Sequence, residues 1–146
     1  MVATQLLPRG ISDEDVLRAM RTVPRHRFVP DNAASLAYGD YPLSVGHNQT
    51  ISQPYIVALM TQLAGAGPGA RVLEVGTGSG YQTAVLAEMG ADVYSVEILE
   101  GLATQARETL NATGYRSVHT RVGDAGDGWQ EHAPYDAIVV TAAPRT

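Results

Sequence analysis

The sequence has 146 residues, of which 45% are hydrophobic, and a formal net charge of −5. This length and composition predict a single globular domain with one core. The negative charge argues against binding to nucleic acid or to an anionic membrane, because both need a concentrated basic patch. No apolar run approaches the roughly 20 residues that span a bilayer, and residues 1–10 lack the pattern of a signal peptide. We therefore expect a cytoplasmic protein.

The residue types restrict the possible chemistry. The sequence contains no cysteine, and all ten of its basic residues are arginines. A disulfide framework and a thiolate zinc site are therefore excluded, as are cysteine nucleophiles, Schiff-base catalysis and a P-loop lysine. The four histidines show no spacing typical of metal ligands, so we expect no metal site.

The first 69 residues are expected to contain two helices separated by an irregular segment. One helix is predicted to begin at Ser12, a good N-cap, and to end before Pro24. A second is predicted to follow Pro54 and to close near Gly65. Its apolar stripe is predicted to consist of Ile56, Leu59, Met60 and Leu63. Residues 25–53 show no sustained period, and long irregular segments in compact domains are usually functional.

From residue 70 onward, short apolar runs alternate with helical patterns. Strands are predicted over residues 72–75, 92–96, 118–122 and 137–140, with helices over 81–89 and 99–112. This alternation is typical of βαβ units and a parallel sheet. The sequence therefore predicts an α/β protein.

A glycine-rich turn follows the first of these strands. Gly76, Gly78 and Gly80 lie between the strand and the next helix, so a ligand can approach bare backbone at the helix start. A dinucleotide fingerprint would need a glycine at the position of Tyr81. The turn therefore disfavours NAD and an NAD-dependent oxidoreductase.

Two acidic residues follow the next two strands. Glu97 stands where a carboxylate accepts hydrogen bonds from ribose hydroxyls, although an acid that balances the dipole of the following helix is an alternative. Asp124 could reach a base edge or serve as a plain turn residue. Together with the glycine turn, these residues predict a ligand-binding crevice at the carboxyl ends of parallel strands.

The sequence also resembles a known family. The run from Gly76 to Tyr81 is similar to motif I of class I methyltransferases, and residues 46–55 resemble the segment that marks protein-L-isoaspartate O-methyltransferases. Residues 23–30, 38, 41–43 and 135–143 match the family pattern as well. The resemblance covers roughly residues 12–143. It implies a Rossmann-like class I methyltransferase fold, with a mostly parallel sheet flanked by helices.

The resemblance implies S-adenosylmethionine as the cofactor. Glu97 would hold its ribose and Asp124 its adenine, and the segment from Gln49 to Ser52 would fold over it. The implied cofactor-binding residues are Gln49, Thr50, Ile51, Ser52, Glu74, Gly76, Thr77, Gly78, Ser79, Gly80, Glu97, Ile98, Asp124 and Ala125.

The implied reaction transfers a methyl group to the carboxylate of L-isoaspartyl residues in damaged proteins or peptides. Ser52 would be the catalytic residue beside that carboxylate; alternatively, it caps the helix that begins at Pro54. The acceptor is already ionised at neutral pH, so no general base is required, and His47 is better interpreted as a loop residue than as a base. An extended peptide would lie along residues 25–53.

Family members continue beyond the run that ends at Ala143, whereas this sequence stops at Thr146. We therefore expect one incomplete domain over residues 1–146, with a substrate-side segment at 1–69, a cofactor-binding core at 70–146 and no C-terminal strands. Residues Ala137 to Val140 would then form an apolar edge that promotes self-association. The alternative to a working methyltransferase is a weak or inactive cofactor-binding or assembly module of the same fold.

Overall fold

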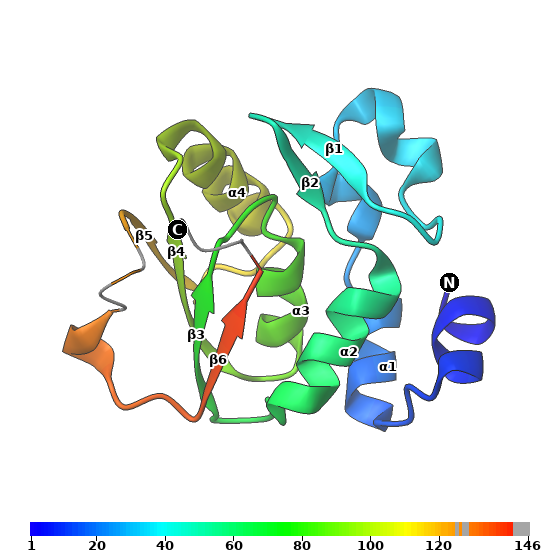
Figure 1. Ribbon diagram of the computed structural model, residues 1–146, viewed down its shortest axis with the longest axis horizontal. Helices are drawn as coiled ribbons and strands as arrows, with labels where there is room; N and C mark the ends of the chain where they lie inside the picture. The colour runs from blue at the N-terminus through cyan, green and yellow to red at the C-terminus, as the bar shows by residue number, and fades with distance from the viewer. Residues whose placement is uncertain (125, 127–128, 142–146) are drawn as a thin grey trace.

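A four-stranded parallel sheet lies toward one side of the molecule, away from the N-terminus (Figure 1). The computed structural model describes residues 1–124, 126 and 129–141. The sheet consists of β3 (Arg71–Val75), β4 (Asp92–Glu97), β5 (His119–Val122) and β6 (Ala137–Val140), in the order β5-β4-β3-β6. Each neighbouring pair is parallel. The predicted α/β class is confirmed, and each predicted strand differs from the observed one by at most one residue at either end.

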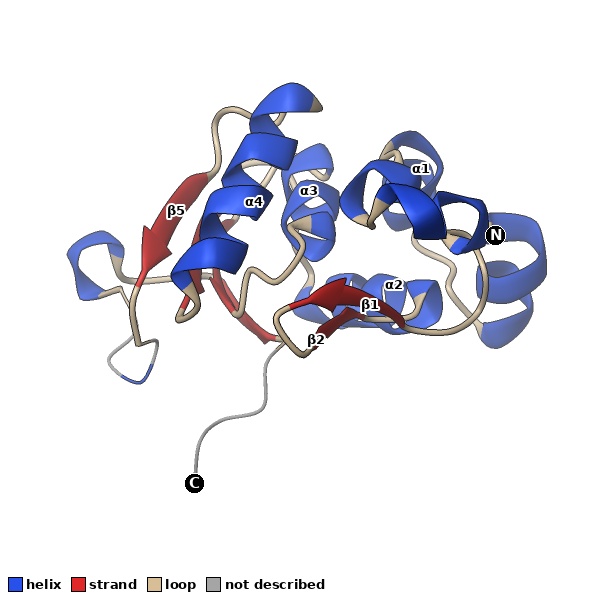
Figure 2. Ribbon diagram, turned by 90° about the horizontal axis from the view of Figure 1, so that it is seen from above, coloured by secondary structure: helices blue, strands red, loops and turns tan. Residues whose placement is uncertain are grey.

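Three helices cover one face of this sheet. The helix α2 (Pro54–Ala64) packs on β6, α3 (Tyr81–Glu88) on β4, and α4 (Glu100–Ala112) on β4 and β5. A fourth helix, α1 (Glu14–Thr22), lies outside this layer against α2 and α3. Figure 2 shows that the N-terminal helices and the sheet lie on opposite sides of α3. In the described part of the chain, no helix is both long and apolar enough to cross a membrane.

One core joins the two halves of the sequence. Val16 and Met20 of α1 belong to the same buried cluster as Tyr81 and Val85 of α3 and Leu110 of α4. The N-terminal half is therefore anchored to the helices that support the sheet. This arrangement places the segment that follows α1 near the carboxyl ends of the strands (Figure 1).

The predicted stripe of α2 is wrong in part. The helix buries Pro54, Val57, Ala58 and Thr61, whereas Ile56 and Leu63 are 37% and 76% exposed. Most residues of α2 are apolar, so periodicity alone does not decide which face turns inward. Packing against both β6 and α1 sets its rotation.

The predicted N-cap of α1 is wrong by one residue. The Asp13 side chain accepts hydrogen bonds from the backbone N–H groups of Asp15 (2.9 Å) and Val16 (3.3 Å). Ser12 instead donates its own backbone N–H to the side-chain oxygen of Gln62 (3.0 Å). Asp13 is thus the capping residue, and its carboxylate also complements the helix dipole.

The segment predicted to be irregular contains regular structure. It opens with the 3-10 helices Arg25–Phe28 and Asp31–Leu36. An antiparallel hairpin follows, formed by β1 (Leu43–Gly46) and β2 (Gln49–Ile51). Two further short helices, Val2–Leu6 and Leu7–Arg9, precede α1, and a 3-10 helix spans Gln130–His132.

The turn of this hairpin explains why the sequence did not predict it. His47 and Asn48 form a two-residue connection with φ angles of 54° and 57°, as a type I′ turn requires. The familiar sequence signal for such a turn is Asn-Gly or Asp-Gly. His and Asn adopt positive φ more readily than most residues, but His-Asn is a weak signal in a sequence.

The second face of the sheet carries a different cover. The ring of Tyr94 in β4 stacks on the rings of His119 and His132, whose centroids lie 4.4 and 4.5 Å away. Trp129 and Tyr135 pack edge-on against the same ring. On β6, Ile138 and Val140 remain 61% and 49% exposed. The segment 129–135 therefore covers the middle of this face and leaves its β6 side open.

Candidate functional site

A cleft lies at the carboxyl ends of the parallel strands, beneath the β1–β2 hairpin (Figure 1). Three segments that are distant in the sequence meet there: the end of the hairpin, the glycine turn after β3, and the end of β4. The residues that line it are Gln49, Thr50, Ile51, Ser52, Val57, Gly76, Thr77, Gly78, Ser79, Tyr81, Gln82, Glu97 and Thr141.

The glycine turn is held in place by backbone hydrogen bonds. Gly76 donates its N–H to the carbonyl of Val96 (2.8 Å), and Gly80 donates to Thr77 (2.9 Å). Gly76, Gly78 and Gly80 have φ angles of 94°, 57° and 92°, a region that side chains disfavour. A β-carbon built on Gly78 would meet no described atom within 4 Å. The backbone at Gly78 is therefore open to a ligand.

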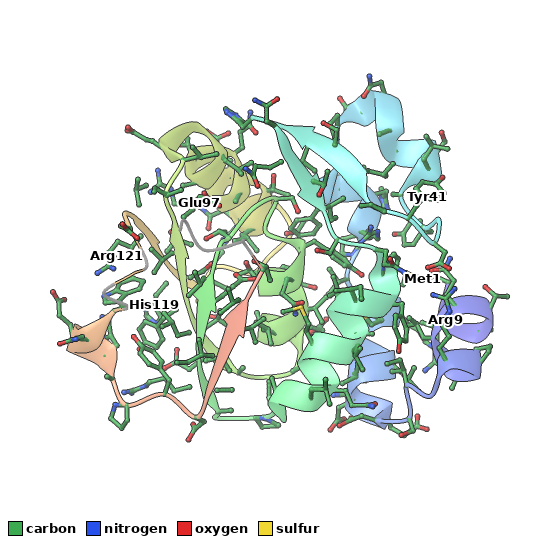
Figure 3. The ribbon with its side chains drawn as sticks, viewed as in Figure 1. Met1, Arg9, Tyr41, Glu97, His119 and Arg121 are labelled. Carbon is green, nitrogen blue, oxygen red and sulfur yellow. The ribbon has the colours of Figure 1, made fainter. Side chains whose placement is uncertain are left out.

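Glu97 connects this turn to the start of α4. Its Oε1 accepts a hydrogen bond from the N–H of Gly78 (2.9 Å), and its Oε2 accepts one from Leu99 (3.0 Å). The residue is 6% exposed and lies at the end of β4 (Figure 3). Each carboxylate oxygen can accept more than one hydrogen bond. The bond to Leu99 shows that the helix-start interpretation and a ligand-binding role are compatible.

Glu74 lies beneath the turn as a fully buried carboxyl group. It accepts hydrogen bonds from the hydroxyls of Thr83 and Ser95, and Ser95 is in turn 2.6 Å from the hydroxyl of Thr77. Burial, aided by the nearby charge of Glu97 and opposed by the hydrogen bonds from Ser95 and Thr83, raises the pKa of Glu74 to about 7. Its second oxygen, Oε2, is buried and has no hydrogen-bond partner among the described residues. Glu74 therefore supports the turn from below rather than lining the cleft.

The hairpin end forms the cover of the cleft. Ile51 is buried in the core, whereas Gln49 and Thr50 are exposed. Ser52 does not cap α2: the N-cap is Gln53, and no side chain makes a cap hydrogen bond there. The alternative of Ser52 as a capping residue is therefore wrong. At the hairpin tip, the exposed His47 ring is so close to α4 that a β-carbon on Gly101 would come within 2.8 Å of it.

Four residues of the predicted set do not line this cleft. The α-carbon of Gly80 faces Ala106 and Leu110 of α4, and Ile98 is 47% exposed beyond the end of β4. Asp124 is exposed and accepts a hydrogen bond from the N–H of Gly126 (2.8 Å), as in an Asx turn. Glu74 is the fourth. Ala125 lies outside the described residues.

Four lining residues were not predicted as site residues: Val57, Tyr81, Gln82 and Thr141. Thr141 directly follows β6 and donates its hydroxyl to the carbonyl of Val75 (3.1 Å). The carboxyl ends of parallel strands meet at one edge, so that position could have been inferred once β6 was placed beside β3. Gln82 is the second residue of α3, directly after the glycine turn, whereas no sequence signal marks Val57 as a lining residue.

Comparison with known proteins identifies the family. The sequence profile for "Protein-L-isoaspartate(D-aspartate) O-methyltransferase (PCMT)" matches residues 1–146. The chain belongs to this family. Curated protein-L-isoaspartate O-methyltransferases from Gloeobacter violaceus and Synechococcus are 63% and 61% identical, over 99% and 100% of the chain. The chain spans 70% and 60% of the length of these two relatives.

Solved structures of the family have the same fold. A protein-L-isoaspartate O-methyltransferase superposes with a TM-score of 0.83 and 32% identity, over 92% of this chain and 45% of the other. A Plasmodium falciparum chain described as a protein-L-isoaspartate O-methyltransferase, crystallised with S-adenosyl-L-homocysteine, gives a TM-score of 0.78 and 27% identity, over 93% and 69%. The chain thus has the Rossmann-like fold of class I methyltransferases.

Proposed function

We propose that the cleft binds S-adenosylmethionine, and that the chain is the cofactor-binding part of an enzyme that methylates the carboxylate of L-isoaspartyl residues in damaged proteins. The observation that carries this proposal is the convergence of Gly76–Ser79, Glu97 and Gln49–Ser52 in one cleft. The Plasmodium falciparum relative crystallised with S-adenosyl-L-homocysteine supports the choice of ligand.

The residues of the cleft fit such a cofactor. Gly78 leaves open space where a side chain would stand, which lets a ligand approach the backbone. Glu97 offers two buried acceptor oxygens to ribose hydroxyls. We further propose that Ile98, Asp124 and Ala125 contact the adenine side, and that Gly80 acts by shaping the turn.

Methyl transfer needs little acid–base chemistry from this protein. When bound, S-adenosylmethionine supplies a methyl carbon activated by the positive sulfonium. The isoaspartyl carboxylate is ionised at neutral pH and attacks without a general base. The task of the chain is therefore to hold nucleophile and methyl carbon in line, since orientation alone can supply most of such an acceleration. We propose that Ser52, at the end of the cover, orients the acceptor carboxylate.

A second candidate function is a cofactor-binding or assembly module with weak or no turnover. The observation that favours it is the length of the relatives, of which the chain spans about 60 to 70%. Both candidates share the cofactor cleft and differ only in catalysis.

Calorimetry with S-adenosyl-L-homocysteine, and with NAD as the competitor, tests the cleft. We expect saturable binding of S-adenosyl-L-homocysteine and no binding of NAD. A preference for NAD would overturn the proposal. A methyl-transfer assay with an L-isoaspartyl peptide, and the matching aspartyl peptide as control, then separates the two candidates. Ligand binding without methylation favours the module.

The remaining proposals concern the context of the chain. We propose that residues 1–146 act as one domain, because one buried cluster includes side chains of both 1–69 and 70–146. We propose a cytoplasmic location and no nucleic-acid or membrane partner, in keeping with the net charge of −5. Self-association through β6 is also proposed, because Ile138 and Val140 are exposed there.

A further inference from the structure

Arg25 is a buried guanidinium that contacts three segments around the cleft. It is 0% exposed. Its Nε donates a hydrogen bond to the carbonyl of Ala37, and its Nη2 donates to the carbonyl of Ser52 (2.9 Å). Its Cζ lies 4.7 Å from the ring centroid of Tyr81, the first residue of α3. One side chain thus connects the segment before the hairpin, the cover of the cleft and the helix that follows the glycine turn.

Stability alone does not account for a charge at this position. Burial lowers the pKa of Arg25, because the charged form loses its hydration. The third nitrogen, Nη1, is buried and finds no hydrogen-bond acceptor within the described ranges. Replacing a buried charged network by apolar side chains is often neutral or stabilising. A guanidinium nonetheless occupies this position, and its explanation lies in the contacts that it makes.

The geometry of the contacts gives that explanation. Ser52 and Tyr81 both line the cleft, and neither contacts the other by a hydrogen bond in the described part of the structure. Arg25 connects the two residues: its Nη2 donates a hydrogen bond to the Ser52 carbonyl, while its Cζ lies over the Tyr81 ring. Burial raises the pKa of Tyr81 to about 12, so the ring remains an uncharged surface at neutral pH. A planar guanidinium can donate hydrogen bonds from its edge and contact a ring at the same time, which a lysine ammonium does with less geometric definition.

We propose that Arg25 is a positioning residue that sets the place of Ser52 relative to the glycine turn. This inference rests on the proposed function, in which Ser52 faces the acceptor carboxylate. Arg25 touches neither cofactor nor acceptor; it acts through the main chain of Ser52. Its loss therefore displaces the cover and leaves Glu97 and the glycine turn, which have their own hydrogen bonds, in place.

Hydrogen exchange of the ligand-free protein tests the positioning role without any assay of turnover. The variants are Arg25→Met, which keeps bulk and loses charge, and Arg25→Lys, which keeps charge and loses the fork. Arg21→Lys, at an exposed position of α1, is the control. We expect amide exchange at residues 49–53 to become at least about 10-fold faster in both Arg25 variants, with exchange in β3 and β4 unchanged.

A purely structural role makes a different prediction. In that case exchange accelerates uniformly in proportion to the loss of global stability, or Arg25→Lys behaves like the control; either result overturns the proposal. If Arg25→Met fails to fold, Arg25→Lys still decides between the two, because it preserves the charge and most of the volume.

Kinetics on an active form of the enzyme provide the second readout. We expect Arg25→Lys to lower kcat for an isoaspartyl peptide by about 10- to 100-fold, as displacement of a reacting group does, with KM and the affinity for S-adenosyl-L-homocysteine within about 3-fold. A rise in KM, or a loss of cofactor affinity, as large as the loss in kcat would contradict the inference. If the unaltered chain binds no S-adenosyl-L-homocysteine, the proposed function fails, whereas the exchange experiment still reports on the link between Arg25 and Ser52.

Discussion

Glu97 combines two tasks in one carboxylate. Its oxygens accept hydrogen bonds from the N–H groups of Gly78 and Leu99, and the residue lines the cleft. The donors of the turn and of the helix start are therefore organised before any ligand arrives. Because the backbone supplies these donors, they fix the position of the carboxylate, and its remaining lone pairs are available to hydroxyl groups.

Replacing Glu97 by alanine should weaken the affinity for S-adenosyl-L-homocysteine by about 1.5 to 3 kcal/mol, the value of hydrogen bonds to a charged group. Calorimetry measures this directly. Glu100→Ala, an exposed acid at the start of α4, is the matched control and should leave the affinity unchanged. Equal losses in the two variants would show that general negative charge, rather than the position of Glu97, matters.

Glu74 should make stability depend on pH. Below pH 4.5 its carboxyl group is protonated in both states; as the pH rises toward about 7, the unfolded chain ionises while the folded protein keeps the proton. The folded state binds more protons over this window, so the free energy of unfolding falls as pH rises, by about 3 kcal/mol, and then levels off.

The variant Glu74→Gln removes this titration. Urea denaturation at about pH 4.5 and about pH 8 should therefore show a difference in stability smaller by roughly 3 kcal/mol than in the unaltered protein. Glu100→Gln serves as the exposed control. A pH dependence that survives in Glu74→Gln would assign the effect to another group.

Site residues were predictable where a motif contains the information. The glycine turn, Glu97 and the segment 49–52 follow from local sequence patterns and from the family resemblance, and the structure brings them together in one cleft. Arg25 was not predictable as a contact of Ser52, because the two are 27 residues apart and only the folded chain brings them together. Thr141 could be predicted as a site residue only once the strand order was known, and the sequence does not state that order.

At the scale of elements, the N-terminal cap of α1 can be tested by substitution. The Asp13 side chain accepts two backbone hydrogen bonds and Ser12 provides none. Asp13→Ala should destabilise the protein by about 1 kcal/mol, the usual cost of losing a cap, whereas Ser12→Ala should change stability by less than about 0.5 kcal/mol. Thermal or urea unfolding measures both, and the reverse order would restore Ser12 as the cap.

Elements with strong periodicity or clear punctuation were predicted well. The strands and helices from residue 71 onward are separated by Gly-rich turns, such as those at Gly90 and Gly114, which adopt φ angles of 87° and 94°. The buried face of α2 was not decided by the sequence, because nearly every position of that helix is apolar. The hairpin was missed because His47 and Asn48 adopt positive φ without a glycine.

At the scale of the whole molecule, β6 is an edge strand of the sheet with exposed apolar side chains. In the strand order within the described ranges, β6 pairs with β3 alone, and its outward side chains Ile138 and Val140 are exposed. Unpaired backbone groups beside apolar side chains favour pairing with another chain. The proposed self-association follows from this arrangement.

Sedimentation velocity over a range of concentrations should show reversible association of the chain, and Ile138→Lys should weaken it by at least about 10-fold, because a charge on an edge strand opposes pairing. The control is Leu36→Lys, which alters a side chain of similar exposure (49%) in the 3-10 helix before the hairpin. A monomer at every concentration, or an equal effect of the two substitutions, would refute association through β6.

The cover of the second sheet face contains the single tryptophan of the chain. Trp129 lies edge-on to Tyr94, with ring centroids 5.5 Å apart, and the guanidinium of Arg121 lies 5.0 Å from its centroid; Figure 3 shows Arg121 and His119 together on this side of the molecule. Its indole does not line the cofactor cleft. Intrinsic fluorescence excited selectively at tryptophan therefore reports whether segment 129–135 is seated on β4, and separates the opening of that cover from events in the cleft.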